Sequence, residues 1–414
     1  MTTARVRSPA ELRGTVRVPG DKSISHRALI FNAVAAGRAR IENLATGEDV
    51  ASTAVCLRAL GVPVGADGVE GVGLHGLKAP QGPLDCGNSG TTMRLLAGLL
   101  AGQPFETTLL GDASLTRRPM DRVSEPLAAM GARVSLDPLR VGGGHLHGAE
   151  HRMAVASAQV KSALLLAGLQ AEGVTRVVEP LRTRDHSERM LTAMAAPIRV
   201  EGTAVEVRRA ARLDPLSMRV PGDLSAAAFW VVAAVFHPRA HIDLPDVGVN
   251  PTRAAILRLL PVARIKDGVE GGEPVASLHA ASLRGLKPWR WSDHLSAELI
   301  DELPVLAVAA TQLAGTTVIT GAAELRVKES DRIAAIAAGL AAMGAQIEER
   351  ADGWAIEGPT RLQGAQVDSF GDHRVAMALA VGGLLASGET EIAGAECVGI
   401  SYPSFWEDLE ELCR

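Results

Sequence analysis

Six apolar, alanine-rich segments recur along the chain and constrain its fold more than any other feature. They are HRALIFNAVAAG, SGTTMRLLAGLLAG, QVKSALLLAGLQAEG, LSAAAFWVVAAVF, IDELPVLAVAATQLAG and DHRVAMALAVGGLLASG. Each is apolar on nearly every side and most end at a glycine, which predicts helices that are buried all round. A spacing of roughly 65–75 residues is typical of an array of repeated supersecondary units.

A second set of segments lies between the first, and its members have polar or proline-containing starts that suit helix caps. They are EDVASTAVCLRALG, PMDRVSEPLAAMGA, HSERMLTAMAA, NPTRAAILRLL, SDRIAAIAAGLAAMGA and YPSFWEDLEEL. Short β-like runs such as ARVSL and PIRVEG follow several of them. We therefore expect an α/β fold with mixed sheets, built as two domains of three units each. A β-solenoid is the alternative, and the long buried helices argue against it.

Composition narrows the class of protein. The 414 residues are 47% hydrophobic and 21% charged, which is typical of a globular chain of two or three domains. The net charge of −5 argues against a general nucleic-acid surface, and the longest apolar runs are too short to span a bilayer. The four cysteines form no CxxC pair, no signal peptide is evident, and no histidine cluster has metal-ligand spacing. We expect a cytoplasmic protein without a metal, a nucleic-acid partner or a membrane partner.

Five of the six buried segments begin with more charged or hydroxyl side chains than simple capping needs. The first begins with Asp21, Lys22, Ser23, His26 and Arg27, and the second begins with GNSGTTMR. The N–H groups at a helix start lack intrahelical partners and bind anions, whereas a lysine or arginine there opposes the helix dipole at a cost of about 0.3–1 kcal/mol. A bound anion would offset that cost. Only the fourth segment, with Asp223 and Ser225, indicates simple capping.

More cations lie beside the amphipathic segments. They are Arg117, Arg118, Arg184, Arg189, Arg326, Lys328 and Arg332. Each alone would be a solvated surface charge, but their recurrence in an acidic chain indicates a site for one or two highly anionic small molecules. Two carboxylates lie among them: Asp301 at the start of the fifth buried segment, and Glu329. For Glu329 a catalytic role and a purely structural one, as an N-cap or in a local ion pair, are equally open.

Nine blocks, in order, resemble the EPSP synthase family of enolpyruvyl transferases. They are PGDKSISHR, GNSGTTMR, RRPM, SAQVKSALLLAGL, TRDHSERML, PGDLSAAAFW, IDELPVLAVAA, RVKESDRI and GDHRVAMA. The resemblance implies two similar domains of three βαβαββ units, an inside-out α/β barrel in each, with an interdomain active-site cleft. We expect a discontinuous first domain of residues 1–20 plus 244–414 and a second domain of residues 21–243, in a monomer.

The resemblance also implies a reaction. The family transfers the enolpyruvyl group of phosphoenolpyruvate to the 5-hydroxyl of shikimate 3-phosphate and releases phosphate, without a metal or organic cofactor. This is a step of the shikimate pathway to chorismate and the aromatic amino acids, and it is inhibited by glyphosate.

Site residues follow by resemblance. Shikimate 3-phosphate would be bound by Lys22, Ser23, Arg27, Ser157, Ala158, Gln159, Arg184, Ser187, Asp301 and Lys328. Phosphoenolpyruvate would be bound by Lys22, Gly90, Arg118, Gln159, Arg332 and Arg374, with Lys328 also a candidate there. Asp301 would take the proton of the 5-hydroxyl, Glu329 would protonate the methylene carbon, and Lys22 would assist at phosphoenolpyruvate.

The chain departs from the family pattern at two positions. Ile400 stands where many members have a lysine, and Ala158 stands where some have a serine. Two alternatives remain open at this point. UDP-N-acetylglucosamine enolpyruvyl transferase shares the fold, although the loop GDASLTRRPM lacks its usual cysteine. A non-catalytic anion-binding protein of the same fold is the other, against which the joint presence of Lys22, Asp301, Glu329 and Arg374 argues.

Overall fold

The computed structural model describes residues 2–289 and 291–414. Its internal contacts divide the chain into two compact units, which we describe separately. Unit 1 consists of Met1–Pro19, Pro221–Gly268 and Pro274–Arg414, and unit 2 consists of Gly20–Val220 and Val269–Glu273.

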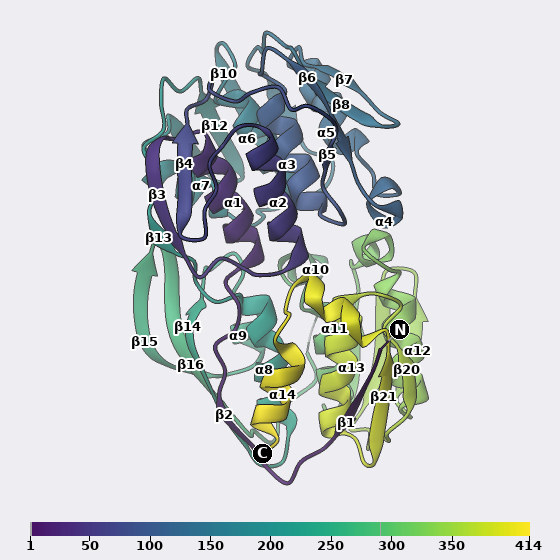
Figure 1. Cartoon of the computed structure of the whole chain (residues 1–414). Coiled ribbons are helices and arrows are strands. Elements are labelled where there is room, and N and C mark those ends of the chain that lie inside the picture. Colours follow the sequence, from purple (N-terminus) through teal and green to yellow (C-terminus); the bar gives the residue numbers. More distant parts are fainter. Residues whose placement is uncertain (1, 290) are drawn as a thin grey trace. The chain divides into compact units, whose positions relative to one another are not determined.

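Three buried helices form the centre of unit 2 (Figure 1): α1 (Lys22–Ala33), α3 (Gly90–Leu100) and α6 (Ala158–Gly168). Each begins at a capping side chain, which fixes where its first turn lies. Helices α3 and α6 approach closely because Gly98 has no side chain, and a Cβ there would lie 2.1 Å from the carbonyl oxygen of Ala163. Their packing holds these helices at fixed places within the unit.

Sheets and amphipathic helices cover this centre. The helices are α2 (Glu48–Ala59), α4 (Ala113–Thr116), α5 (Asp121–Ala129) and α7 (His186–Ala193). The strands are β3 (Ala36–Glu42), β4 (Gly68–Val72), β5 (Leu84–Asp85), β6 (Glu106–Leu110), β7 (Arg133–Ser135), β8 (Leu139–Gly142), β9 (Glu150–Arg152), β10 (Val174–Val178), β11 (Ile198–Glu201), β12 (Ala204–Arg208) and β13 (Met218–Arg219). In the part of the chain that the structure describes, they form three sheets of order β13-β3-β4, β5-β6-β8-β7 and β11-β12-β10-β9. Strand β6 alternates exposed and buried residues, as a sheet with one face on a core requires.

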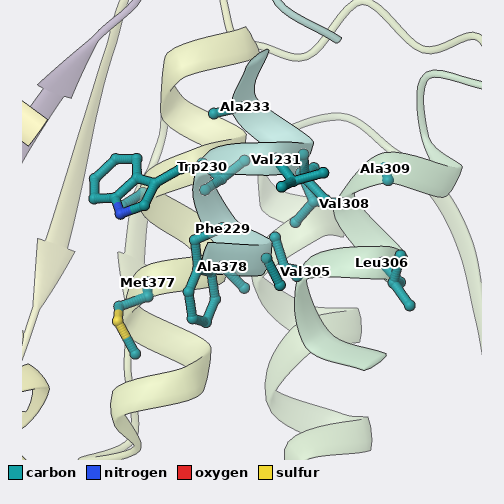
Figure 2. Close-up of a cluster of buried hydrophobic side chains, with 14 of the residues drawn as sticks. Phe229, Trp230, Val231, Ala233, Val305, Leu306, Val308, Ala309, Met377 and Ala378 are labelled. Atoms are coloured by element: carbon teal, nitrogen blue, oxygen red, sulfur yellow. The ribbon is translucent and has the colours of Figure 1, made fainter. Parts of the chain in front are cut away.

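Unit 1 has the same design around α8 (Leu224–Phe236), α11 (Leu303–Ala310) and α13 (His373–Leu385). Figure 2 shows side chains of these helices packed together, among them Phe229, Val305 and Met377. Helix α8 is apolar on all sides because it contacts both other helices, so no face of it remains for water.

The remaining elements of unit 1 surround these helices. The helices are α9 (Ile256–Leu259), α10 (Asp293–Glu298), α12 (Arg332–Ala342) and α14 (Phe405–Leu412), with 3₁₀ turns η1 (Ala323–Val327) and η2 (Ala395–Ile400). The strands are β1 (Thr3–Arg7), β2 (Leu12–Thr15), β14 (Ala240–Gly248), β15 (Ala263–Glu270), β16 (Glu273–Ala281), β17 (Gly315–Ile319), β18 (Gln346–Arg350), β19 (Gly353–Gly358), β20 (Gln366–Asp368) and β21 (Glu389–Ala393). The described strands form sheets of order β1-β21-β20, β15-β16-β14-β2 and β17-β19-β18. Parallel and antiparallel pairs mix within the first of them, so the expected α/β fold with mixed sheets is confirmed.

The expected helix over NPTRAAILRLL is a single helical turn, α9, which is a correction. The preceding residues form turns because Asn250 Oδ1 accepts hydrogen bonds from the backbone N–H and the hydroxyl of Thr252, at 2.9 and 2.8 Å. Such a side-chain bond to the backbone competes with helix formation.

The expected division of the chain near residue 244 is also corrected. The contacts change from unit 2 to unit 1 between Val220 and Pro221, so α8 belongs to unit 1 and not to a domain of residues 21–243. The physical reason is the burial of α8 against α11 and α13. The tip of the β15–β16 hairpin, Val269–Glu273, is grouped with unit 2, which the sequence did not indicate.

Candidate active site

The start of α1 carries the first group of expected site residues. Asp21 caps the helix by accepting a hydrogen bond from the N–H of Ile24 at 2.9 Å, so Lys22 and Ser23 lie in the first turn. Lys22 Nζ forms an ion pair with Asp49 of α2. The sequence analysis missed Asp49, since its only signal was a carboxylate in the first turn of an amphipathic helix.

Arg27 gathers several side chains one turn further along α1. It is 2% exposed, and it donates from Nε to Ser187 Oγ at 2.8 Å and from Nη2 to Ser162 Oγ at 2.7 Å. It also donates from Nη1 to the carbonyl of Ser23 at 2.9 Å. Burial lowers the pKa of Arg27 to about 10, against the opposing effect of the nearby carboxylates. The structure therefore brings Ser23, Arg27 and Ser187 together.

Ser162 was not expected in this group. Its Oγ lies 2.6 Å from Ser187 Oγ and donates to the carbonyl of Ala158, one turn earlier in α6. Ser157 caps α6 by accepting a hydrogen bond from the N–H of Val160 at 3.4 Å. Arg184 lies close enough to Arg27 to contribute to the lowering of its pKa. The starts of α1, α6 and α7 thus supply one polar set within unit 2.

A second polar set in unit 2 surrounds the start of α3. Gln159 donates from Nε2 to Thr91 Oγ1 at 2.9 Å and accepts from Arg94 Nη1 at 2.5 Å. Arg118 Nη2 donates to Asn88 Oδ1 at 2.8 Å. A Cβ built on Gly90 would lie 2.9 Å from Arg94 Nη1 and 3.4 Å from Arg118 Nη1. Gly90, Arg118 and Gln159 therefore lie together, and Arg94 joins them although the sequence analysis did not single it out.

The third set lies in unit 1 and is organised by Arg332. Its side chain is 2% exposed, and it donates from Nη2 to Glu329 Oε2 at 2.6 Å and from Nε to Asp372 Oδ2 at 2.8 Å. Its Nη1 lies 3.7 Å from Asp301 Oδ1. Arg374 donates from Nη1 to the carbonyl of Asp301 at 3.3 Å. The structure thus joins Asp301, Glu329, Arg332 and Arg374, which lie far apart in the sequence.

Electrostatics in this third set follow from its crowding. Burial lowers the pKa of the Arg332 guanidinium, but Asp372, Glu329 and Asp301 outweigh it and hold that pKa above its ordinary value. Burial also lowers the pKa of Lys328, and Asp301 opposes that shift. Lys328 is therefore near Asp301, which agrees with its expected place.

Two details of the sequence expectations are corrected here. Glu329 is not a helix cap, because Asp331 caps α12 by accepting a hydrogen bond from the N–H of Ala334 at 3.1 Å. Asp301 does not begin a buried helix, since it lies in the turn before α11. Ile400 is half-buried at the end of η2, where it packs against the hydrophobic core of unit 1.

Among residues 2–289 and 291–414, no group of three histidine, cysteine, aspartate or glutamate side chains has the arrangement of a metal site. No helix in the described part of the chain is long and apolar enough to cross a membrane.

Comparison with known proteins agrees with the fold. The family model described as EPSP synthase (3-phosphoshikimate 1-carboxyvinyltransferase) matches residues 6–409. A curated 3-phosphoshikimate 1-carboxyvinyltransferase of Gloeobacter violaceus is 54% identical over 96% of both chains. One from Synechococcus sp. (strain RCC307) is 52% identical over 97% of both. A solved structure of EPSP synthase from Acinetobacter baumannii has a TM-score of 0.88 and 40% identity, covering 99% of this chain and 98% of that one.

Among the described residues each unit has three sheets, and cations, hydroxyls and carboxylates lie near helix starts. The likeness to solved EPSP synthase structures places this fold in the class of enolpyruvyl transferases. Within that class the chain belongs to the EPSP synthase family, and it is a transferase. The alternative of a UDP-N-acetylglucosamine enolpyruvyl transferase is not favoured.

Proposed function

We propose that the chain transfers the enolpyruvyl group of phosphoenolpyruvate to the 5-hydroxyl of shikimate 3-phosphate and releases phosphate, with the residue roles given below. The main support for these roles is that the Arg332 side chain donates a hydrogen bond to Glu329 and lies beside Asp301. Two carboxylates close together can serve as the acid and the base that the reaction needs, and Arg332 contacts both.

Shikimate 3-phosphate is assigned to unit 2. The hydroxyls of Ser23, Ser157 and Ser187 and the guanidiniums of Arg27 and Arg184 are donors for a phosphate dianion. Helix starts add backbone N–H groups, among them that of Ala158. The partners of Arg27 are neutral serine oxygens and a carbonyl, so its charge remains available to attract an anion. Gln159 and Lys22 complete this set.

Phosphoenolpyruvate is assigned to cations that the family resemblance indicates. Lys22, Arg118, Arg332 and Arg374 would bind its phosphate and carboxylate. Gly90 leaves space beside Arg118, because it has no side chain of its own. These cations also stabilise the phosphate as it leaves.

Asp301 and Glu329 would move the protons. Glu329 delivers a proton to the methylene carbon of phosphoenolpyruvate, which makes the adjacent carbon electrophilic. Asp301 takes the proton of the attacking 5-hydroxyl, and the C–O bond forms a tetrahedral intermediate. The methyl group then returns a proton to the Glu329 carboxylate, the C–O bond to phosphate breaks as phosphate leaves with its electron pair, and the enolpyruvyl double bond is restored. Lys328 supplies positive charge beside these carboxylates.

Phosphate release with both substrates, measured for Asp301→Asn and Glu329→Gln, tests these roles. We expect kcat to fall by about 10²–10⁴, the usual contribution of general acid–base catalysis. Glu349→Gln is the matched control, because Glu349 pairs with Arg326 at the surface of the same unit. Wild-type kcat in either site variant would contradict the assignment, and turnover with UDP-N-acetylglucosamine instead of shikimate 3-phosphate would contradict the reaction.

We also propose that the protein works as a monomer in the cytoplasm. The support for the cytoplasm is that Cys56, Cys86 and Cys397 are buried free cysteines, and free cysteines are usual in proteins of reducing compartments. Size-exclusion chromatography with light scattering tests the oligomeric state.

A further inference from the structure

Unit 1 contains its own version of the helix start that binds substrate in unit 2. The tripeptide Pro-Gly-Asp precedes both α1 and α8, so Ser225 corresponds in sequence to Ser23. Asp223 caps α8 by accepting a hydrogen bond from the N–H of Ser225 at 2.8 Å. The sequence alone indicated only this cap, but the structure adds two buried charges to it.

The first added charge is the carboxylate of Glu302, which is 1% exposed. Ser225 Oγ donates a hydrogen bond to Glu302 Oε1. A carboxylate at the start of an apolar helix lies where the helix dipole favours an anion. The Glu302 carboxylate therefore lies at the start of α8 in the place where another helix start would bind an anionic ligand.

The second added charge is Arg253, which is 3% exposed. Its Nη2 donates to Ser225 Oγ and, at 3.2 Å, to Asp223 Oδ1, and it lies 3.6 Å from Glu302 Oε1. Burying these charges is costly unless each is paired and hydrogen-bonded. Arg253 donates a hydrogen bond to Asp223 and forms an ion pair with Glu302 Oε1, whereas the buried Glu302 Oε2 has no hydrogen-bond partner among the described residues. The cluster is therefore held by Arg253 and Ser225 acting on one oxygen of Glu302.

The cluster is connected to the reaction through the backbone. Glu302 directly follows Asp301, and its N–H donates to the carbonyl of Leu299 at 2.8 Å. The carbonyl of Asp301 accepts from Arg374 at 3.3 Å. The backbone at Asp301 is thus fixed at two points. Arg374 donates to the carbonyl of Asp301, and Ser225 and Arg253 contact the side chain of the next residue, Glu302.

We propose that Glu302 and Arg253 are positioning residues for Asp301, an inference that rests on the proposed role of Asp301 as the base. Glu302 occupies the start of α8 as an internal anion and fixes the turn before α11. That turn determines where the Asp301 carboxylate lies relative to Arg332. A displacement of about 1 Å in a reacting group costs as much as 10²-fold in rate.

Steady-state kinetics of Glu302→Gln and Arg253→Met test the proposal. We expect kcat to fall about tenfold to a hundredfold, with little change in KM for either substrate and wild-type binding of shikimate 3-phosphate by calorimetry. Glu298→Gln is the matched control, since Glu298 lies on the preceding helix and pairs with Arg258, a partner that is largely exposed. It should have wild-type kinetics.

Ser225→Ala is the milder variant, because it removes only the hydroxyl that links α8 to Glu302. If Glu302→Gln does not fold, Ser225→Ala tests the proposal in its place. Ser225→Ala should lower kcat and leave KM unchanged. Wild-type kcat in a folded Glu302→Gln or in Ser225→Ala would overturn the proposal, as would a parallel loss of shikimate 3-phosphate binding.

A double-mutant cycle separates this proposal from the role of Asp301 itself. In an Asp301→Asn background the effect of Glu302→Gln on kcat should vanish, because the group that Glu302 positions is gone. An undiminished effect there would overturn the positioning role. Wild-type kcat in Asp301→Asn alone would instead contradict the proposed base, which is a different result.

Discussion

Arg332 Nη2 donates a hydrogen bond to Glu329 Oε2 over 2.6 Å, and the Arg332 side chain is almost completely buried. The same guanidinium bonds Asp372, which is itself buried at the cap of α13. Arg332 therefore holds two functions at once: it pairs with a proposed catalytic acid, and it ties α12 to α13.

Arg332→Met should destabilise the protein by about 3–5 kcal/mol, because it leaves the buried Asp372 and the partly buried Glu329 without their cation. Urea unfolding followed by circular dichroism measures the change. Arg326→Met is the control from the same segment, since Arg326 pairs with Asp331 and Glu349, which are both more exposed. That control should cost about 1 kcal/mol or less. If both variants lost the same free energy of unfolding, burial of the ion pair would not determine how much its removal destabilises the protein.

Lys161→Met should likewise destabilise unit 2 by about 3–5 kcal/mol. Lys161 is fully buried and pairs with Glu179 at 2.9 Å and Glu188 at 2.6 Å. Adding Glu179→Gln and Glu188→Gln to Lys161→Met should recover part of the loss, because no uncompensated charge then remains. Differential scanning calorimetry of the single and triple variants measures this, and a triple variant less stable than the single one would refute it.

The Lys161→Met deficit should also depend on pH. Burial raises the pKa of Glu188, and Lys161 opposes that shift. Without Lys161, burial and the charge of Glu179 raise the pKa of Glu188 against only a backbone hydrogen bond, so the folded state holds its proton to higher pH than the unfolded chain. A carboxyl group whose pKa is raised in the folded state stabilises the protein fully below its unfolded pKa of about 4.3. This contribution disappears as pH rises through the pKa of the folded state. The stability gap between variant and wild type should therefore widen from pH 4.5 to pH 7, and a constant gap would contradict this.

His26 should make the stability of unit 2 depend on pH in the opposite direction. Burial, followed by the charges of Lys22 and Arg27, lowers the pKa of His26 well below 6.5. In the unfolded chain this histidine takes up a proton near pH 6.5, while the folded protein keeps it neutral, so stability falls as pH drops. The slope is as much as about 1.4 kcal/mol per pH unit.

His26→Asn should remove this part of the slope between pH 6.5 and pH 5, because asparagine does not titrate. The free energy of unfolding from urea titrations at several pH values gives the comparison. His294→Asn is the control, since His294 is exposed on α10. An unchanged slope in His26→Asn would show that His26 is not the group responsible.

The sequence predicted local groupings well. Helical spacing alone places Lys22, Ser23 and Arg27 at one helix start, and the GNSG run indicates a cap that Ser89 does provide. The six buried helical segments were predicted because a helix that is apolar on every side has no other stable environment.

Contacts between distant segments were beyond the sequence. Ser225 was interpreted as a cap because its carboxylate partner, Glu302, lies 77 residues away. Ser162 was missed for the same reason, since its role depends on Arg27 of another helix. The sequence did mark the position Val220–Pro221, where the chain passes from unit 2 to unit 1, because the block RVPGD occurs at both places where the chain changes unit. The meaning of this block became clear only from the burial of α8 in unit 1.

Gly90→Ala should weaken inhibition by glyphosate more than it weakens substrate binding. A Cβ at position 90 would lie 2.9 Å from Arg94 Nη1 and 3.4 Å from Arg118 Nη1. These are the ends of flexible side chains, so the helix accepts alanine and the guanidiniums move. Movement of Arg118 disturbs the place assigned to phosphoenolpyruvate, while the serine cluster around Arg27 is not touched.

We therefore expect KM for phosphoenolpyruvate to rise, KM for shikimate 3-phosphate to stay near wild type, and the inhibition constant of glyphosate to rise by about tenfold or more, ~1.4 kcal/mol. Gly82→Ala is the control, because a Cβ there would meet nothing within 4 Å. Inhibition assays at fixed shikimate 3-phosphate and varied phosphoenolpyruvate supply both constants. An equal rise in KM for phosphoenolpyruvate and in the inhibition constant of glyphosate would mean that the added methyl group acts only by moving Arg118. In that case Gly90 would not provide space for the inhibitor, and its proposed role would be wrong.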